Sequence, residues 1–380
     1  MTEAEEVRLA QALLRAPSPS GRESPAAEAL RAVLEQLGYD ETFIDRAGNA
    51  VGLIRAGDGP TLMLNGHLDT VPVGDEALWP HPPLSGAVAG GMLWGRGACD
   101  MKAALACMAL AGADARSAGF RGTLIVAGVV QEEVGGLGAR HLAAEHRTDL
   151  VILGEPSRLR LMHGHRGRVE VHVRLPGRIA HAARGELGEN ALYRAAAYLR
   201  ALETLELPRG GPLERSSLTP TRLTTFPEGG ANVVPGRADL VIDYRNLPGD
   251  EPEAILARLR ALDARAEVYV PEREAASESG EVRHRQPGVV PPYLAPPDHA
   301  LIAPVRRALA RVLAGEGRSL EEGHWWFATD APELAATGGL VLGFGPGEEE
   351  LAHTTREHVP LEELALARRA YREVALELGG

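Results

Sequence analysis

Hydrophobic and polar residues follow two different patterns along the chain. In the first pattern, short apolar runs typical of strands buried on both faces are separated by segments with helical spacing. The predicted strands cover residues 50–54, 62–64, 124–130, 150–153 and 340–344. The predicted helices cover residues 4–38, with a break at 17–21, and residues 103–111, 139–145 and 301–313. Strands that alternate with helices predict an α/β domain with a mainly parallel sheet flanked by helices.

The second pattern begins after residue 163. Residues 168–175 alternate strictly between polar and apolar, as in a strand with one solvated face. A helix, a strand, a helix and a strand are then predicted at 191–202, 238–243, 252–262 and 267–270. This order favours a small α+β unit with a ferredoxin-like arrangement. Residues 272–297 are rich in Glu, Ser, Gly and Pro, so we interpret them as a linker back to the first domain.

The sequence therefore predicts a discontinuous main domain, residues 1–163 and 281–380, that carries an inserted domain, residues 164–280. The net charge of −12, from 40 basic and 52 acidic residues, argues against a nucleic-acid partner. No apolar run approaches the ~18 residues of a membrane span, so we expect no membrane partner. The two cysteines and the acidic N-terminus, which lacks a targeting pattern, favour a reduced, cytoplasmic location.

Polar side chains follow several of the predicted buried strands at the point where each strand ends. Because the carboxyl ends of parallel strands open onto the ligand crevice of a sheet, these side chains are expected at one rim. Asp100, in the Gly-rich segment 95–102, joins them. The candidate metal ligands are His67, Asp100, Glu133, Glu155 and His353.

Carboxylate oxygens and imidazoles without a thiolate suit Zn²⁺, Co²⁺ or Mn²⁺. Five ligands are too many for one tetrahedral ion that also keeps a water molecule, so two divalent ions that share a carboxylate are predicted. Asp69, two residues from His67, is a candidate for orienting that imidazole. Glu132 points away from its neighbour Glu133 if both are extended, which leaves its carboxylate free for general base and acid work.

Five motifs along almost the whole chain resemble those of the co-catalytic zinc aminoacylases and exopeptidases, which include acetylornithine deacetylase, succinyl-diaminopimelate desuccinylase, aminoacylase and glutamate carboxypeptidase. The motifs are Gly-His-Leu-Asp-Thr-Val-Pro at 66–72, Gly-Arg-Gly through Asp-Met-Lys at 95–102, Glu132-Glu133, Gly-Glu-Pro at 154–156, and His353. The resemblance implies that His67 and Glu155 bind one metal ion, that Glu133 and His353 bind the other, and that Asp100 bridges them.

The same resemblance implies that the inserted domain is a dimerisation or lid domain. His181 would then reach the active site of the partner subunit and stabilise the oxyanion, while Asn232 and Arg245 would grip the carboxylate of the substrate. Two segments depart from the family pattern, residues 327–331 and the loop 208–217. Both segments lie near the positions where members of the family select their substrates. The resemblance therefore predicts the reaction rather than the substrate.

The expected function is that of a metal-dependent amide hydrolase, active as a homodimer with two ions, Zn²⁺ first and Co²⁺ or Mn²⁺ next. It would remove an N-acyl group, acetyl first, from an amino acid with a free carboxylate, as acetylornithine deacetylase does. A dipeptidase or carboxypeptidase acting on a short peptide and a succinyl-diaminopimelate desuccinylase are the alternatives. From other classes, a catalytically silent amino-acid-binding dimer and a nucleotide-linked oxidoreductase remain, the latter without a dinucleotide fingerprint at 135–138.

Overall fold

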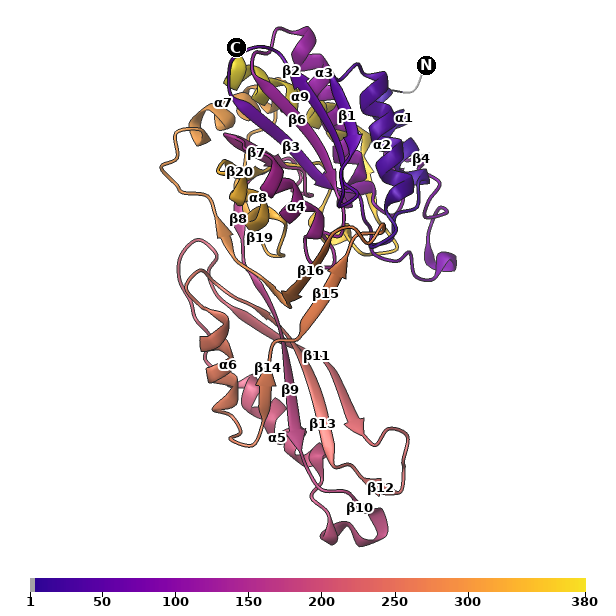
Figure 1. The fold of residues 1–380 in the computed structure, drawn as a ribbon, viewed down its shortest axis with the longest axis vertical. Helices are drawn as coiled ribbons and strands as arrows, with labels where there is room; N and C mark the ends of the chain where they lie inside the picture. The colour runs from indigo at the N-terminus through magenta and orange to yellow at the C-terminus, as the bar shows by residue number, and fades with distance from the viewer. Residues whose placement is uncertain (1–3) are drawn as a thin grey trace.

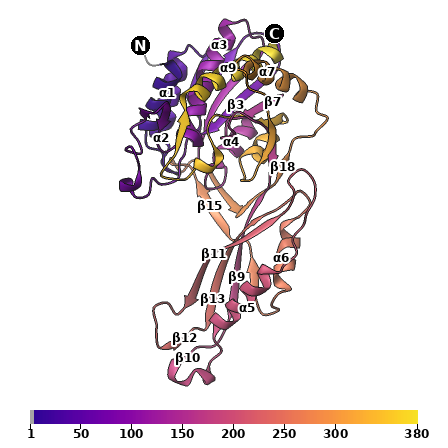
Figure 2. The ribbon, with the colours of Figure 1, turned by 180° about the vertical axis from the view of Figure 1, so that it is seen from behind.

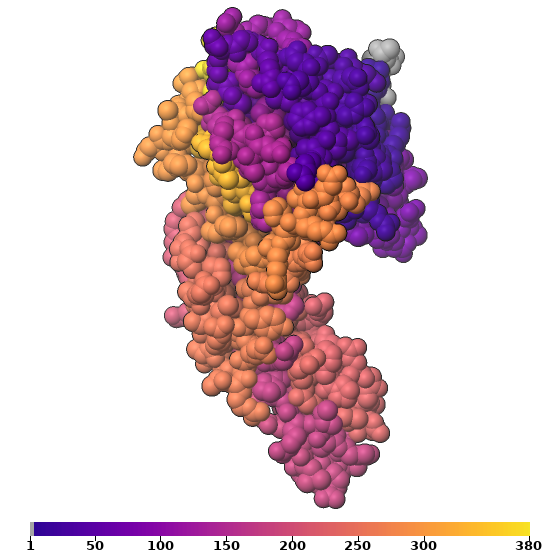
Figure 3. All heavy atoms as spheres, viewed as in Figure 1, coloured from indigo at the N-terminus to yellow at the C-terminus, as the bar shows by residue number. Residues whose placement is uncertain are grey.

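Two sheets, one toward each end of an elongated molecule, organise the chain (Figure 1). The computed structural model describes residues 4–380. Both ends of the described chain lie in the broader part, and the narrower part is built from the middle of the sequence (Figure 3). The predicted division into a main and an inserted unit is visible in this shape, while the limits 1–163, 164–280 and 281–380 stay a prediction.

The main sheet has nine strands in the order β1-β2-β6-β3-β7-β20-β8-β18, with β19 beside β8. Its four central neighbours β6, β3, β7 and β20 are parallel, as predicted, whereas β2 is antiparallel to both of its neighbours. The strands are β1 Glu41–Ile44, β2 Ala50–Arg55, β3 Thr61–His67, β6 Thr123–Val129, β7 Leu150–Leu153, β8 Leu161–His165, β18 Tyr293–Leu294, β19 Glu322–Trp325 and β20 Leu340–Gly343.

Helices cover both faces of this sheet. Side chains of a strand alternate between its two faces, so the apolar residues of the central strands are buried against helices on both sides. In β3, Leu62 and Leu64 pack into the cluster that contains α3, while Met63 packs into the cluster that contains α4 and α8. None of the helices between residues 4 and 380 has the length and apolar character needed to cross a membrane. The helices of the main unit are α1 Glu5–Arg15, α2 Ser24–Gln36, α3 Ala103–Ser117, α4 Leu137–Glu145, α7 Ile302–Ala314, α8 Ala331–Leu334 and α9 Leu361–Gly379.

The second sheet has the predicted ferredoxin-like arrangement. Its strands β9 Arg168–Pro176, β11 Ser217–Phe226, β13 Arg237–Arg245 and β14 Glu267–Tyr269 pair antiparallel in the order β11-β13-β9-β14. Helices α5 Ala191–Glu203 and α6 Pro252–Arg260 lie against one face, where alternate strand residues form a separate core (Figure 2). Strand β11 was missed by the sequence pattern because Pro220 interrupts it. At the edge of a sheet and beside a bulge, a missing N–H costs little.

The segment 272–297 is not the plain linker that we expected. It contains a hairpin of β15 Glu272–Ala276 and β16 Arg283–Pro287, followed by β17 Val289–Val290 on β9 and then β18. Its polar composition reflects an exposed two-stranded ribbon, in which Arg285 contacts Glu272 at 2.6 Å and Arg283 contacts Glu274 at 3.5 Å across the strands. Composition alone cannot distinguish such a ribbon from a loop.

Smaller elements complete the fold. β4 Ala87–Ala89, β5 Met92–Trp94 and β21 His358–Pro360 form a three-stranded sheet, and β10 Ala180–His181 pairs with β12 Val233–Val234. Short helical turns cover Glu76–Leu78, Ala98–Lys102, Ala182–Leu187, Ala335–Thr337 and Glu349–Leu351.

Close packing of β20 against Trp325 gives a test of the fold. A Cβ atom at Gly343 would collide with the buried indole ring, which is fixed by a 2.8 Å hydrogen bond from Trp325 Nε1 to the Pro156 carbonyl. We expect Gly343→Ala to destabilise the protein by about 1–3 kcal/mol, measured as a lower Tm in scanning calorimetry. Gly323→Ala is the control, because its Cβ would meet Met162 Sδ at an ordinary 3.6 Å. Equal Tm values for the two variants would contradict the packing.

Candidate active site

The parallel strands deliver the predicted polar residues to one edge of the main sheet. His67 is the last residue of β3, and Glu132 and Glu133 follow β6. Glu155 follows β7, and Asp100 lies in the turn Ala98–Lys102 that precedes α3. Because these strands run in the same direction, their carboxyl ends meet at one place.

Asp100 lies between two histidines. Its Oδ1 is 2.8 Å from His67 Nε2, and its Oδ2 is 3.1 Å from His353 Nε2. The two oxygens of one carboxylate therefore face two different imidazoles, as a ligand shared by two metal ions would. Asp100 is 8% exposed and His67 is 2% exposed, so the pair is nearly withdrawn from water.

The remaining carboxylates divide between the same histidines. Glu155 Oε1 is 3.7 Å from His67 Nε2, and Glu133 Oε1 is 2.9 Å from His353 Nε2. One atom each of His67, Asp100 and Glu133 lie within 4.8 Å of one another, and so do those of His67, Glu132 and Glu155. The structure thus brings all five candidate ligands and Glu132 together.

The electrostatics of this cluster favour cations. Burial raises the pKa of Glu155, and burial with the charges of Asp330 and Glu155 raises that of Glu132. Hydrogen bonds to Asp100 and Glu133 raise the pKa of His353 to about 10. Crowded, buried carboxylates beside two imidazole nitrogens are a donor set that fits two divalent ions, because only added positive charge would relieve their mutual repulsion.

Asp69 contacts His67 mainly through its main chain. Its carbonyl oxygen is 2.8 Å from His67 Nδ1, whereas its carboxylate Oδ1 is 3.7 Å from that nitrogen. The carboxylate accepts the N–H groups of Glu132 at 3.0 Å and Glu133 at 3.2 Å, and the hydroxyl of Ser20 at 2.7 Å. Asp69 therefore holds the backbone of the candidate base Glu132 and of the candidate ligand Glu133. Sequence reasoning missed Ser20, although the turn 17–21 that carries it was recognised.

Two further residues near the cluster were missed. Glu357 accepts the N–H groups of Cys99 and Asp100, both at 3.2 Å, and is paired with Arg96, so it fixes the turn that presents Asp100. Asp330 is 5% exposed, and its burial raises its pKa to about 7. It belongs to the segment that departs from the family pattern. No local sequence signal marks Glu357, because its role depends on a contact far along the chain.

The cluster borders a cavity of about 560 Å³ that lies between the main sheet, the hairpin and the near end of the inserted unit. Arg168 and Arg245 enter it from β9 and β13, and Arg273 enters from β15. Trp326 and Phe327 also line it. Of the predicted substrate-binding residues, Arg245 is therefore at the cavity, and its guanidinium pairs with Asp243 at 2.6 Å.

Within one chain, His181 and Asn232 do not lie at this cavity. They lie together at the far tip of the inserted unit, where β10 and β12 pair and the Ala182 N–H donates to the Asn232 carbonyl at 2.9 Å (Figure 1). The His181 side chain is exposed, and its Nδ1 accepts the N–H of Ala183. A role of these residues at the cavity would require a second copy of the chain.

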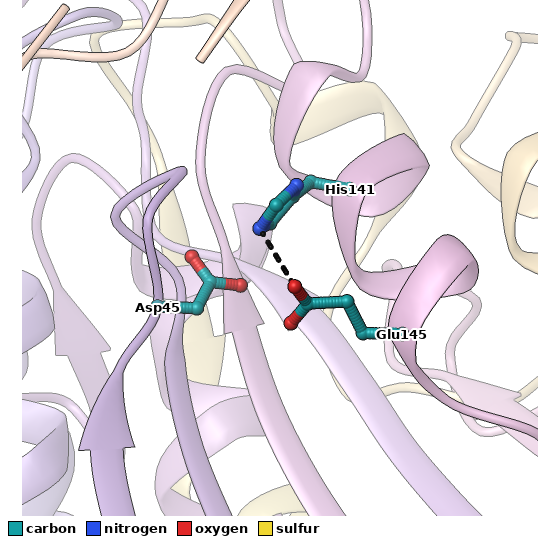
Figure 4. Close-up of side chains that lie close together, drawn as sticks. All are labelled: Asp45, His141 and Glu145. Carbon is teal, nitrogen blue, oxygen red and sulfur yellow. Dashed lines mark ion pairs between the residues drawn. The ribbon is translucent and has the colours of Figure 1, made fainter. Parts of the chain in front are cut away.

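A separate trio, Asp45, His141 and Glu145, lies outside the cavity, with its side chains directed at one another (Figure 4). His141 Nε2 is 3.5 Å from Glu145 Oε1. Asp45 Oδ1 accepts the N–H groups of residues 47, 48 and 49 at 2.8–3.0 Å, so its contacts are those of a residue that shapes the turn before β2.

The sequence matches a known family over most of its length: the model of peptidase family M20/M25/M40 covers residues 63–377. The chain belongs to this family. It is 31% identical to the acetylornithine deacetylase of Myxococcus xanthus over 360 residues, which are 90% of this chain and 88% of that protein. The resemblance to aminoacylases and exopeptidases is confirmed at the level of the family, and the chain is a metal-dependent hydrolase of it.

Solved structures confirm the fold class. An M20 family metallo-carboxypeptidase of Sulfolobus solfataricus superposes with a TM-score of 0.79 at 17% identity, over 99% of both chains. Aminopeptidase PepT of Bacillus cereus superposes with a TM-score of 0.76 at 20% identity, over 99% of this chain and 98% of that one. Both therefore share the arrangement of a helix-flanked sheet and a separate sheet unit.

The shared position of Asp100 predicts the metal content. We expect the wild-type protein to bind about two divalent ions per chain and His353→Ala to bind about one, because only one of the two histidine–carboxylate sets is removed. Mass spectrometry of metals in the dialysed proteins measures this. His141→Ala is the matched control and should keep the wild-type content. Loss of a whole ion in that control would instead assign metal to the Asp45 trio.

Proposed function

We propose that this protein hydrolyses the amide bond of an N-acyl amino acid with a free carboxylate, and that the acyl group is acetyl. The proposal rests on one observation: a carboxylate shared by two histidines borders a cavity that arginines also line. A relative that is named for deacetylating acetylornithine supports a deacylase.

Two metal ions complete the proposed centre. His67 and Glu155 would hold one, Glu133 and His353 the other, and Asp100 would be shared by both. We propose Zn²⁺, with Co²⁺ or Mn²⁺ as substitutes, because imidazole and carboxylate ligands accept all three. When bound, the ions would supply Lewis-acid polarisation of the scissile carbonyl and lower the pKa of a nearby water molecule.

Glu132 is the proposed proton carrier. It takes a proton from the attacking water and delivers that proton to the departing amine. Its carboxylate lies beside the proposed ligands Glu155 and His67, and the hydrogen bond from its N–H to Asp69 fixes its main chain. Asp69 therefore acts by positioning both His67 and Glu132.

Arg245 is proposed to bind the carboxylate of the substrate, and a homodimer is proposed to complete the site. His181 and Asn232 lie at the end of the inserted unit away from the cavity of their own chain, so they would serve the cavity of the partner chain. There the imidazole of His181 would stabilise the oxyanion, and Asn232 would help to grip the substrate carboxylate.

A peptidase is the second candidate. A terminal peptide bond is also an amide next to a free carboxylate, so the same arginines and the same metal centre suit a dipeptidase or carboxypeptidase. The Sulfolobus solfataricus protein is named a metallo-carboxypeptidase, and Bacillus cereus PepT is named an aminopeptidase. A succinyl group in place of acetyl, as in succinyl-diaminopimelate, is the remaining variant of the deacylase.

Hydrolysis of a substrate panel tests the proposed function. We expect the metal-loaded protein to release free amine from N-acetyl amino acids, to lose this activity on chelation, and to regain it with Zn²⁺, Co²⁺ or Mn²⁺. Dipeptides and succinyl-diaminopimelate complete the panel. If only dipeptides are cleaved, the second candidate replaces the first. If a fully metallated protein cleaves nothing, an amino-acid-binding role gains support.

A mixing experiment tests Glu132 and His181 together. We expect Glu132→Ala alone to lower kcat by about 10²–10⁴-fold with unchanged metal content, and His181→Ala to be impaired as well. When the two inactive variants are unfolded together and refolded as mixed dimers, half of the dimers are mixed and each has one intact site, so about a quarter of the wild-type activity should return. No recovery, under conditions in which the wild-type protein refolds to full activity, would show that His181 acts in its own chain, and a fully active His181→Ala variant would show that it has no role.

A further inference from the structure

We propose that the amino acid released by this enzyme carries a bulky apolar or aromatic side chain, which binds to an apolar wall formed by Val289, Val290, Trp326 and Phe327. The inference rests on the proposed function and narrows its substrate class. It separates this protein from an enzyme selective for a cationic side chain such as that of ornithine.

The apolar wall is a fixed feature of the cavity. Trp326 is 51% exposed although its neighbour Trp325 is 2% exposed, so a large indole stands free in the cavity. Its ring packs edge-on against Phe327, with centroids 5.3 Å apart and planes at 78°. Phe327 in turn packs against the core of the main unit. An exposed aromatic ring held by such contacts loses little entropy when an apolar group covers it.

The acidic groups on this side of the cavity are already neutralised. Glu170 contacts Arg273 at 2.6 Å, and Glu333 contacts Arg140 at 2.6 Å. Asp243, next to the cavity, contacts both Arg168 and Arg245. An ammonium group placed beside these residues would therefore lose its hydration without gaining an unpaired carboxylate.

Asp330 is the remaining acidic group that lines the cavity. It is 5% exposed, and the nearby charges that act on it include those of His67 and Asp69 at the proposed metal centre. Its Oδ1 lies against Gly136, in the loop after Glu133, and its Oδ2 is buried without a hydrogen-bond partner among the described residues. The other carboxylates that line the cavity within residues 4–380 belong either to the proposed metal centre or to ion pairs with arginine.

The wall lies beside the proposed carboxylate-binding arginines. Val290 pairs directly with Arg168 across β17 and β9. Arg166 donates from Nη2 to the Trp326 carbonyl at 3.2 Å, and the positive charge of Arg245 acts on Arg166. A substrate whose α-carboxylate is bound at Arg245 would therefore have its side chain within reach of the wall.

A pair of isosteric substrates tests the inference. N-acetyl-norleucine and N-acetyl-ornithine differ only in a terminal methyl group against an ammonium group. We expect the metal-loaded enzyme to prefer N-acetyl-norleucine by at least about tenfold in kcat/KM. Equal rates, or a preference for N-acetyl-ornithine, would overturn the inference and leave the proposed deacylase standing. If neither substrate nor any other N-acetyl amino acid is cleaved, the proposed function itself fails.

Variants of Trp326 test the wall directly. We expect Trp326→Ala to lower the ratio of kcat/KM for N-acetyl-norleucine over N-acetyl-glycine by about tenfold, because N-acetyl-glycine has no side chain to place on the wall. Trp326→Phe should keep most of this ratio. Leu78→Ala, which removes a 66% exposed side chain that does not line the cavity, is the matched control and should leave the ratio unchanged. An unchanged ratio in Trp326→Ala would contradict the role of the wall.

Discussion

The carboxylate of Asp100, placed between His67 and His353, is the contact on which the rest of the site depends. Each of its oxygens faces one imidazole, so a displacement of this one side chain would disturb both halves of the proposed metal centre. A buried carboxylate keeps such a position only if its surroundings compensate for lost hydration. Here the compensation comes from the two histidines, while Glu357, which is itself paired with Arg96, binds the main chain of the turn and fixes its position.

The main sheet provides the rigidity that this contact needs. Parallel strands end at one edge, so they place His67, Glu132 and Glu155 within a few ångströms although the residues are far apart in sequence. Asp69 then ties the main chain of the proposed base Glu132 to the N-terminal turn through Ser20. The placement of these side chains is thus fixed by the sheet edge and its hydrogen bonds. The inserted unit carries His181 and Asn232 at its tip, away from the cavity of its own chain.

Specificity has a different physical origin from the chemistry. The proposed metal ligands follow family motifs, but Phe327 begins the segment that departs from the family pattern and Trp326 immediately precedes it. Their rings border a cavity in which arginines already pair with acidic side chains. In our proposal, the balance between exposed apolar surface and neutralised charge, rather than the metal centre, decides which side chain a substrate can carry.

The sequence by itself determined the fold class, the main elements of the inserted unit other than β11, and the residues that gather at the edge of the sheet. Buried strands and their polar ends have a local signature, because burial and chain direction are set over a few residues. The hairpin of β15 and β16, strand β11, and the roles of Ser20, Glu357 and Trp326 were decided only by the tertiary structure. Each depends on a partner distant along the chain, as Glu357 does on the turn that contains Asp100. Local composition does not predict such a contact.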